Sequence, residues 1–339
     1  MAENIKSENI KAGHPSGRTQ MSCRLSVLPF LAKYGTIIGL AIMIAIFSFL
    51  APVAFPTVSN FVNVLNQASL GIIIAGGLTV AVIVGELDLS IGFSASFLGV
   101  LVTGLMVWVH LPVPVAILAV LLVGAFIGFI NGVIVTKIGV NSVIATLGTG
   151  TIIVGLNFAY SSGAPIAMGV PDAFVDIALG RLWGIPHNVL IMVLVIAVLW
   201  VVVERTSIGQ SIQAVGGNPV ASRLSGIPVH KVKIIAFMIC GACAALTGLL
   251  LASSLGSGTT SAADGYLLSA FAAVFLGSAT LRDGEFHILG TVFGALIIAV
   301  GFNGLAIFGA PTFYQYVFQG AILIVAVGLS SLGRLYAAP

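Results

Sequence analysis

The chain alternates long apolar segments with short polar or proline-containing breaks. Runs such as 190–203 and 232–252 carry at most one charged residue, which is typical of membrane helices rather than of the roughly 10-residue alternating strands of a membrane barrel. A helix that crosses a bilayer needs about 20 apolar residues. At that length the breaks divide the chain into ten predicted helices, at about 31–51, 64–84, 90–109, 115–135, 143–161, 188–203, 232–254, 265–281, 288–308 and 314–332.

Composition places these segments in lipid. Charged residues make up 7% of the chain, against about 25% in soluble domains, and hydrophobic residues make up 59%, with a mean hydropathy of +1.18. Because lipid offers no hydrogen bonds, a spanning backbone must satisfy its own polar groups. We therefore predict an all-α integral membrane protein with about ten transmembrane helices. The net charge of +3 is too small to indicate a nucleic-acid partner.

The basic residues predict how the helices are oriented. If the N-terminus is cytoplasmic, alternation of the ten helices puts twelve of the 13 Lys and Arg residues on the cytoplasmic side and only Arg181 outside. Cytoplasmic loops are enriched in these residues. We therefore expect both termini in the cytoplasm, with a tail at 1–30, a ten-helix transmembrane domain at 31–333 and a short tail at 334–339.

One break contains two acidic residues. The stretch 64–109 is too long for one helix and has Glu86 and Asp88 near its middle. An acidic group just before a helix stabilises it by interacting with the positive end of the helix dipole. One hypothesis is therefore that Asp88 or Ser90 simply caps the next helix. The alternative is that Glu86 pairs with a base and closes an inner gate. The candidate bases are Lys137 and Arg282.

The chain lacks the residue patterns of an enzyme. It contains no H-E-x-x-H sequence, its five histidines are scattered near helix ends, and no Gly-Lys pair occurs, which excludes a phosphate-binding loop. Cys240 and Cys243 lie within an apolar run, without a second ligand pair for zinc. We expect no catalytic residue, metal site or cofactor in this chain.

Few ionisable groups fall within the predicted helices. Carriers that couple transport to protons or sodium usually bury such groups in the membrane. If transport is active, we therefore expect the energy to come from a cytoplasmic partner. The alternative is a self-contained secondary carrier, or a channel, for a small neutral solute.

The predicted cytoplasmic loop 205–230 contains a short helix with signals at both ends. Asn218 is a favourable cap and Pro219 suits the first helical position, whereas Gly226 suits the left-handed position after the last turn. The apolar side chains at helical spacing are Val220, Leu224 and Ile227, with Arg223 beside them. A two-turn helix is not stable alone in water, so it must dock on its own membrane domain or on a partner.

Several motifs carry a family resemblance. They are Gly85-Glu-Leu-Asp-Leu-Ser-Ile-Gly92, Val143-Ile-Ala-Thr-Leu-Gly148, Ala214-Val-Gly-Gly-Asn218, Ala272-Ala-Val-Phe-Leu-Gly277 and Asn303-Gly-Leu305. Together, over about residues 35–332, the chain resembles ribose-type permeases of ATP-binding-cassette sugar importers. The ribose-type motif has Gly-Ile-Asp-Leu-Ser, so Glu86 is a departure that resembles the xylose-type branch.

The resemblance implies a multi-pass permease subunit of the bacterial inner membrane. Such a subunit imports a monosaccharide or related polyol by alternating access and pairs with a second permease copy, identical or a paralogue. A separate cytoplasmic ATPase binds ATP and Mg, and a periplasmic sugar-binding protein delivers the substrate. In this setting, the helix at 218–225 is expected to couple the membrane domain to the ATPase.

Polar side chains inside the predicted helices are candidates for a translocation path. They are Asn66, Gln67, Asn131, Asn157, Asn303 and Gln319. Such groups are costly in lipid and must face protein or a cavity. Uncharged amides suit a sugar, which offers hydroxyls and no charge, and we expect Asn303 and Gln319 in particular to line the path. The alternative is that these residues only bind neighbouring helices together.

Overall fold

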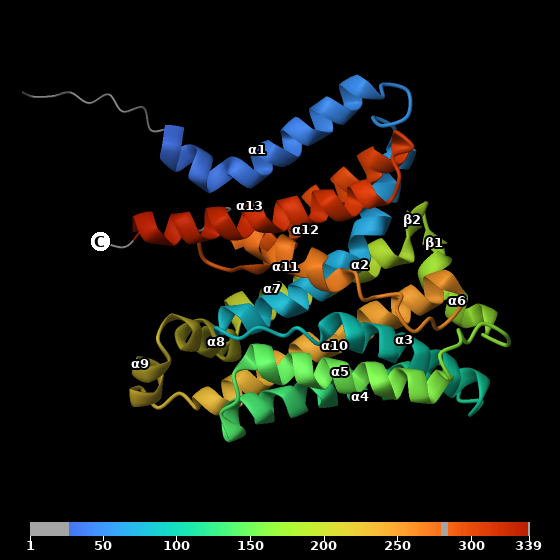
Figure 1. The fold of residues 1–339 in the computed structure, drawn as a ribbon, viewed down its shortest axis with the longest axis horizontal. Coiled ribbons are helices and arrows are strands. Elements are labelled where there is room, and N and C mark those ends of the chain that lie inside the picture. Colours follow the sequence, from blue (N-terminus) through green and yellow to red (C-terminus); the bar gives the residue numbers. More distant parts are fainter. Residues whose placement is uncertain (1–26, 279–283, 338–339) are drawn as a thin grey trace, which may run out of the picture.

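The computed structural model describes residues 27–278 and 284–337, with side chains over 34–278 and 284–328. The described residues form thirteen α-helices, a π-helical turn and one small hairpin (Figure 1). Ten of the helices match the ten predicted segments. They are α1 (Val27–Leu50), α2 (Val58–Ile83), α3 (Ile91–Val107), α4 (Val113–Val133), α5 (Ser142–Ser161), α7 (His187–Arg205), α10 (Val229–Leu255), α11 (Tyr266–Ser278), α12 (Ile288–Ile307) and α13 (Phe313–Ala337).

Parts of the predictions fall outside the described residues. Of the predicted tail 1–30, only 27–30 are described, and they open α1. The predicted tail 334–339 is described as far as Ala337, where α13 ends. The last residues of the predicted helix 265–281, together with Arg282, also lie outside the described part, because α11 ends at Ser278.

Length and composition divide the matched helices into two groups. Six are long and apolar enough to cross a membrane: α2, α4 together with the π-helical turn η1 (Ile134–Ile138), α5, α7, α10 and α12. Four apolar helices are shorter: α3, α11, α1 over Tyr34–Leu50 and α13 over Phe313–Gly328. The described chain is therefore all-α, with six long candidate spans and four shorter ones.

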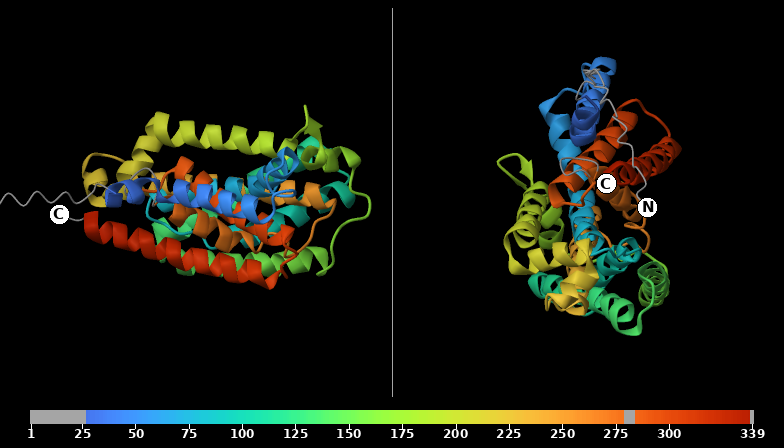
Figure 2. Two further views of the ribbon diagram at one scale, coloured as in Figure 1. Left: turned by 90° about the horizontal axis from the view of Figure 1, so that it is seen from above. Right: turned by 90° about the vertical axis from the view of Figure 1, so that its left-hand side faces the viewer.

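Helix α10 lies in the interior and packs against α2, α3 and α4 (Figure 2). Its contact with α4 is close because both helices present glycine. A Cβ atom on Gly128 of α4 would lie 2.1 Å from the carbonyl oxygen of Phe237, and one on Gly241 of α10 would lie 2.2 Å from that of Gly124. Small residues let membrane helices approach backbone to backbone, so these glycines set the spacing between α4 and α10.

We expect Gly128→Ala to lower the thermal stability of the detergent-solubilised protein. The added methyl group would meet the α10 backbone, and overpacking of this kind typically costs about 1–3 kcal/mol. Gly155→Ala is the matched control, because Gly155 of α5 is exposed and a Cβ there has nothing within 4 Å. Unfolding midpoints of the two variants would test this, and equal midpoints would contradict the close contact.

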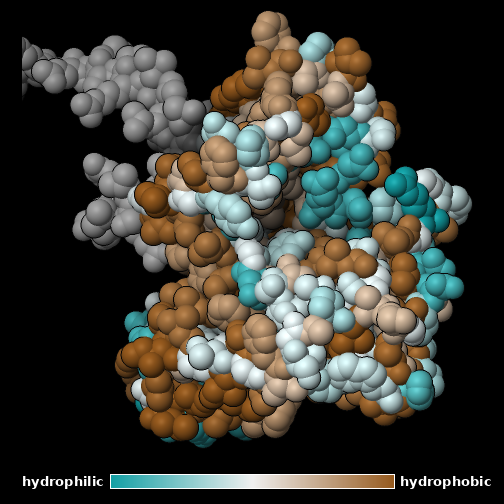
Figure 3. Space-filling model, turned by 45° about the vertical axis from the view of Figure 1, so that its right-hand side comes forward, coloured by the Kyte–Doolittle hydropathy of each residue, from teal (hydrophilic) through white to brown (hydrophobic). Residues whose placement is uncertain are grey.

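The outer helices turn apolar faces away from the bundle. In the most apolar window of α4 only 22% of residues are buried, compared with 78% in α2. The exposed Leu118, Leu122 and Phe126 of α4 recur every four residues, so they form one stripe on the side of the helix away from its glycines. Apolar residues likewise cover large parts of the surface in Figure 3. Lipid is the solvent that such faces require.

Three elements were not predicted from sequence. They are α6 (Asp172–Leu179), the hairpin of β1 (Arg181–Leu182) and β2 (Ile185–Pro186), and α8 (Ser207–Gly217). Helix α8 directly precedes α9 (Pro219–Leu224), which matches the predicted short helix. Helix α8 has a recognisable start, since the Thr206 side chain accepts a hydrogen bond from the Gly209 N–H at 3.2 Å.

The two ends of the bundle differ. Figure 1 shows the first turn of α1 and the last turn of α13 at the same end as α8 and α9, whereas α6, β1 and β2 lie at the opposite end. We call these the α9 end and the hairpin end. The helical part of the chain therefore begins and ends at the same end of the bundle, as an even number of crossings requires.

Candidate functional site

A cavity of about 470 Å³ lies between α2, α7, α10, α11, α12 and α13. Ligand pockets commonly measure about 300–1,000 Å³. The described residues that line it carry no formal charge. They are Asn66, Gln67, Ala68, Leu70, Gly71, Asn188, Ser254, Ala262, Gly265, Tyr266, Ser269, Ala295, Ile298, Ala299, Phe302, Thr312, Gln315, Tyr316 and Gln319.

The cavity belongs to the hairpin end. Three of its helices begin there and contribute residues from their first turns, such as Asn188 of α7 and Tyr266 of α11. Helix α10 contributes Ser254 from its last turn. Gln67 and Tyr316 line the cavity and are also exposed at the surface, so the cavity opens to the outside of the protein. Figure 3 shows hydrophilic surface gathered on this side of the molecule.

Hydrogen bonds order the polar side chains in the cavity wall. The Asn188 amide donates to Asn66 Oδ1 at 3.3 Å and to Ser254 Oγ at 3.4 Å, which joins α7 to α2 and α10. On the other side, Gln319 Nε2 donates to Ser269 Oγ at 2.8 Å and to the Gly265 carbonyl oxygen at 3.3 Å. The wall therefore presents amides and hydroxyls held in fixed orientations.

Three of the six predicted path residues, Asn66, Gln67 and Gln319, line this cavity. The other three lie elsewhere and bind neighbouring segments. Asn303 exchanges two hydrogen bonds of 3.0 Å with Asn60, which tie α12 to α2. Asn157 Nδ2 donates to the Thr260 carbonyl oxygen at 2.8 Å. These contacts correspond to the helix-binding alternative considered for each residue.

The third residue, Asn131, belongs to a buried network at the break between α2 and α3. Thr149 of α5 donates to Asn131 Oδ1 at 2.6 Å, and Asn131 Nδ2 donates to Ser90 Oγ at 2.9 Å. Ser90 in turn donates from Oγ to Asp88 Oδ1 at 2.6 Å, and its N–H donates to the same oxygen at 2.9 Å. Asp88 therefore stabilises the start of α3, while Ser90 makes no side-chain cap of its own.

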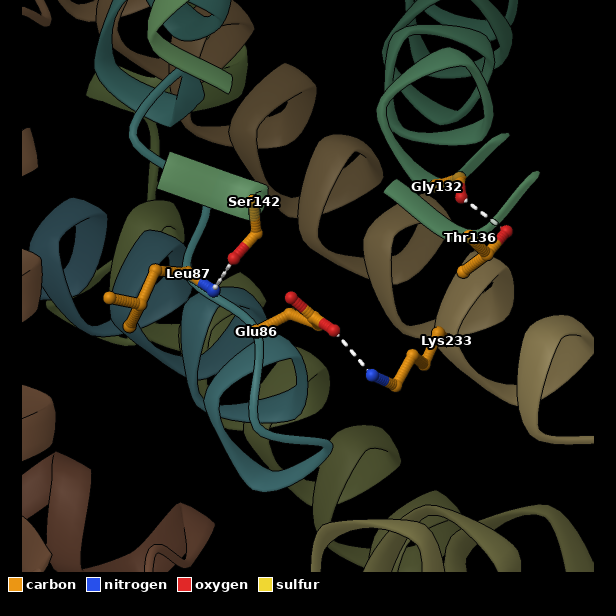
Figure 4. Close-up of polar contacts among 6 residues, drawn as sticks. All are labelled: Glu86, Leu87, Gly132, Thr136, Ser142 and Lys233. Carbon is orange, nitrogen blue, oxygen red and sulfur yellow. Dashed lines mark hydrogen bonds and ion pairs between the residues drawn. The ribbon is translucent and has the colours of Figure 1, made fainter. Parts of the chain in front are cut away.

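Glu86, two residues earlier, forms an ion pair with Lys233 of α10 (Figure 4). The predicted partner Lys137 is therefore wrong, and Arg282 lies outside the described residues. The adjacent Leu87 N–H donates to Ser142 Oγ of α5 at 3.3 Å. Glu86 is 8% exposed, so the pair is largely shielded from water. Sequence spacing gave no sign of it, because Glu86 and Lys233 are 147 positions apart.

Helix α9 has the local geometry that its sequence predicts. Asn218 Oδ1 accepts hydrogen bonds of 3.0 Å from the Val220 and Ala221 N–H groups, and Gly226 adopts a left-handed φ of 84°. Val220 and Leu224 are 70% and 84% exposed. Ile227 instead packs partly against the core. The apolar face that α9 leaves uncovered thus consists of Val220 and Leu224, one turn apart.

Both flanks of α9 contact the break between α2 and α3. Upstream, Gly216 of α8 approaches the α2 backbone so closely that a Cβ atom there would meet the Ile83 carbonyl oxygen. Downstream, Lys233 lies near the start of α10 and pairs with Glu86. The segment from Ile83 to Glu86 is therefore in contact with residues on both sides of α9, Gly216 before it and Lys233 after it.

Sequence reasoning missed several residues of the cavity. Asn188 and Ser254 lie at the ends of their helices, where a polar residue is also expected at a membrane boundary, so neither stands out in the sequence. Tyr266 and Ser269 belong to α11, whose short length made it the hardest segment to delimit. Only the packing of six helices shows that these residues share one wall.

Comparison with known proteins decides the family. Residues 60–327 match the family model described as the permease component of the branched-chain amino acid transport system. The chain belongs to this permease family. It is a non-catalytic, multi-pass membrane subunit of a bacterial ATP-binding-cassette importer, which decides against a self-contained carrier or channel.

Three relatives of the permease are named as sugar permeases. It is 39% identical over 301 residues to the ribose import permease of Haemophilus influenzae, an alignment that covers 88% of this chain and 93% of that one. It is 34% identical over 303 residues to the D-allose permease of Escherichia coli, covering 89% and 93%. The galactose/methyl galactoside permease of Haemophilus influenzae is 33% identical over 296 residues, covering 82% and 88%. No solved structure matches the permease.

Proposed function

We propose that the permease forms the translocation path for a neutral monosaccharide, a pentose or a hexose, and that the cavity at the hairpin end is the outer part of this path. The observation that carries the proposal is the uncharged polar lining. A phosphate or a carboxylate would require a fixed positive charge, whereas amides and hydroxyls suit sugar hydroxyls. The sugars named for the relatives, ribose, allose and galactose, belong to this class.

The aromatic side chains in the cavity add to this argument. Phe302 and Tyr316 line it together with the amides, and the Phe318 ring packs against Phe302 in a tilted arrangement, with ring centroids 6.1 Å apart. A sugar ring presents apolar C–H faces as well as hydroxyls. A wall with both aromatic and amide groups can therefore contact a sugar from two sides.

We further propose that the α9 end faces the cytoplasm, which places both termini there. The described basic residues support this orientation, since Lys137, Arg205, Arg223, Lys231 and Lys233 belong to elements of the α9 end and Arg181 belongs to the hairpin. The cavity then opens toward the periplasm, where a sugar-binding protein would deliver its load. A second permease copy, identical or a paralogue, would complete the path within the lipid.

Helix α9 is proposed as the contact with the ATPase, which would bind ATP and Mg. Family membership implies such a partner, and the uncovered Val220 and Leu224 supply an apolar face for it. The break at Glu86, Asp88 and Ser90 is proposed as the inner closure of the path. Because both flanks of α9 contact this break, a shift of α9 on ATP binding would act on the closure directly.

The proposed substrate class can be tested by reconstitution. The permease, its cognate ATPase and its binding protein would be placed in proteoliposomes, and ATP-driven uptake of ribose, allose and galactose compared with that of leucine and gluconate. We expect uptake of at least one neutral sugar, but no uptake of leucine, which is a zwitterion, or of gluconate, which is an anion. ATP-driven uptake of leucine with no sugar uptake would refute the proposal.

We also expect uptake to be lost when the binding protein is omitted. The lining offers only neutral hydrogen bonds, which contribute about 0.5–1.5 kcal/mol each, so the permease alone is expected to bind sugar weakly. Calorimetry on the purified permease is the direct measurement. Submicromolar binding by the permease alone would contradict this expectation.

A further inference from the structure

The hairpin between α6 and α7 exposes an aromatic side chain at its turn. Trp183 is 93% exposed, and its neighbours Leu182 and Ile185 are 47% and 41% exposed. Leu182 pairs with Ile185 across the hairpin, so the turn consists of Trp183 and Gly184 alone. Contiguous exposed apolar side chains mark a surface that contacts something outside the chain. The tip of the hairpin is such a surface.

The backbone of the turn does not explain the tryptophan. Trp183 has a φ of 52° and Gly184 a φ of 83°, which is the two-residue turn with both positions left-handed. Asparagine or glycine is favoured at its first position, whereas a bulky side chain with positive φ is strained. Because Trp183 is almost wholly exposed, packing within the chain does not offset this strain. Backbone strain of this kind points to a function of the residue that adopts it.

The hairpin projects sideways from the bundle, toward lipid. Both views of Figure 2 show it extending beyond the neighbouring helices on the side where α7 lies. Helix α7 begins directly after β2, and its exposed residues Leu194, Val198 and Val201 recur at helical spacing. This stripe is an apolar face of the kind that lipid covers.

The length of α7 places the hairpin at the boundary of the hydrocarbon layer. Its 19 residues, at about 1.5 Å each, extend over about 28 Å, and the hydrocarbon core is about 30 Å thick. The residues just before α7 therefore lie where hydrocarbon gives way to headgroups. Tryptophan is enriched at this level, because its ring is apolar and its N–H group is polar.

Arg181 supplies a charge complementary to a phospholipid headgroup. It is exposed at the start of β1, and among the described residues it forms no ion pair, since the pair found there is that of Lys233 with Glu86. It is also the described basic residue that lies at the hairpin end, away from the others. A guanidinium binds a phosphate through paired hydrogen bonds, so a headgroup phosphate suits this position.

We propose that the hairpin anchors the permease to the membrane surface. Trp183 inserts between the headgroups and the acyl chains of the leaflet at the hairpin end, and Arg181 binds a phospholipid phosphate there. The anchor holds the start of α7, because the His187 N–H donates to the Gly180 carbonyl oxygen at 2.9 Å across the base of the hairpin. The next residue, Asn188, lines the cavity. The hairpin thus ties one wall of the cavity to the bilayer, whichever solute the permease carries.

The fluorescence of Trp183 tests this proposal. The chain has three tryptophans, so Trp108→Phe together with Trp200→Phe leaves Trp183 as the only one. This variant is placed in nanodiscs of phosphatidylcholine whose acyl chains carry bromine, a quencher, either near the headgroup or near the chain ends. We expect strong quenching by bromine near the headgroup, weak quenching by bromine near the chain ends, and emission at shorter wavelength than that of tryptophan in water.

Two further variants in the same background separate the roles of the two side chains. Arg181→Gln is expected to reduce the quenching by bromine near the headgroup, because the contact with phosphate is lost. The matched control is Lys231→Gln, an exposed basic residue at the α9 end, which is expected to leave the quenching unchanged. If the variant with one tryptophan is not recovered, the difference in emission between the unmodified permease and Trp183→Asn gives the same measurement, since Asn-Gly is favoured in this turn.

Each other outcome overturns a part of the proposal. If the water-soluble quencher acrylamide quenches Trp183 as fully as free tryptophan, the hairpin lies in water and is no anchor, and protection by added binding protein would assign it to that partner. If neither acrylamide nor brominated lipid quenches Trp183, another protein surface, such as a second permease copy, covers it. Unchanged quenching in Arg181→Gln would refute the phosphate contact.

Discussion

Replacing Leu224 by aspartate is expected to abolish ATP-driven uptake while leaving the permease inserted in the membrane. Leu224 is 84% exposed on α9, so its loss removes little from the fold of the permease itself. If the ATPase covers this side chain, burial contributes about 1.5–3 kcal/mol, and each 1.4 kcal/mol changes affinity about tenfold. An acidic group in the same apolar contact adds a desolvation cost. Docking is therefore expected to weaken at least about tenfold.

Co-purification of the ATPase with the permease, together with uptake in proteoliposomes, would measure this effect. Leu224→Met keeps an apolar side chain of similar volume and is expected to retain both properties. Gly226→Pro tests the same segment through its backbone, because proline cannot adopt the left-handed φ of 84°. Normal uptake by both Leu224→Asp and Gly226→Pro would refute the assignment of α9 to the ATPase contact.

The second large effect is expected from Glu86→Gln. This change leaves Lys233 without its carboxylate in a largely buried position. Removing one partner of a fully buried pair costs about 3–5 kcal/mol, and the cost is smaller here because the Lys233 side chain is 20% exposed. If the pair holds the inner closure, the variant is expected to leak sugar in the absence of ATP and to hydrolyse ATP at a raised basal rate.

The charge-swapped double variant Glu86→Lys with Lys233→Glu is expected to reverse part of this defect, since it restores an ion pair with opposite direction. Lys231→Gln is the matched control, because Lys231 is exposed two positions before Lys233 and we assign it no role in the closure. Passive sugar efflux and basal ATP hydrolysis are the measurements. If Glu86→Gln changed neither sugar efflux nor basal ATP hydrolysis, the proposed closure would be refuted. The break would then only stabilise the start of α3.

Much of the architecture follows from local signals in the sequence. Apolar segments of about 20 residues can only be helices in lipid, and ten such segments match ten helices of the described chain. The α9 boundaries are also local, because a cap such as Asn218 and a left-handed residue such as Gly226 act within a few positions. Helix α8 was missed although Thr206 caps it, since its weaker apolar pattern was interpreted as loop.

Side-chain partners could not be predicted in this way, because contacts between helices join residues that are far apart in the chain. The sequence singled out Glu86 but could not select Lys233 over Lys137, since helix packing alone decides which base comes within reach. It singled out six amides and favoured Asn303 and Gln319, of which only Gln319 lines the cavity. The packing of α2 against α7 and α10, and of α13 against α11, brings some of them to the cavity and leaves the others, such as Asn303, in contacts between helices.

What the sequence by itself determined is thus the solvent, the number of apolar helices and the cap of the short helix, which depend on composition and on neighbours within one turn. Tertiary structure alone decided the ion pair at the break, the uncharged cavity and the hydrogen bonds that join Asn188 to Asn66 and Ser254. Each of these requires groups from two or more helices within hydrogen-bonding distance, and hydropathy along a chain contains no information about which faces of those helices meet.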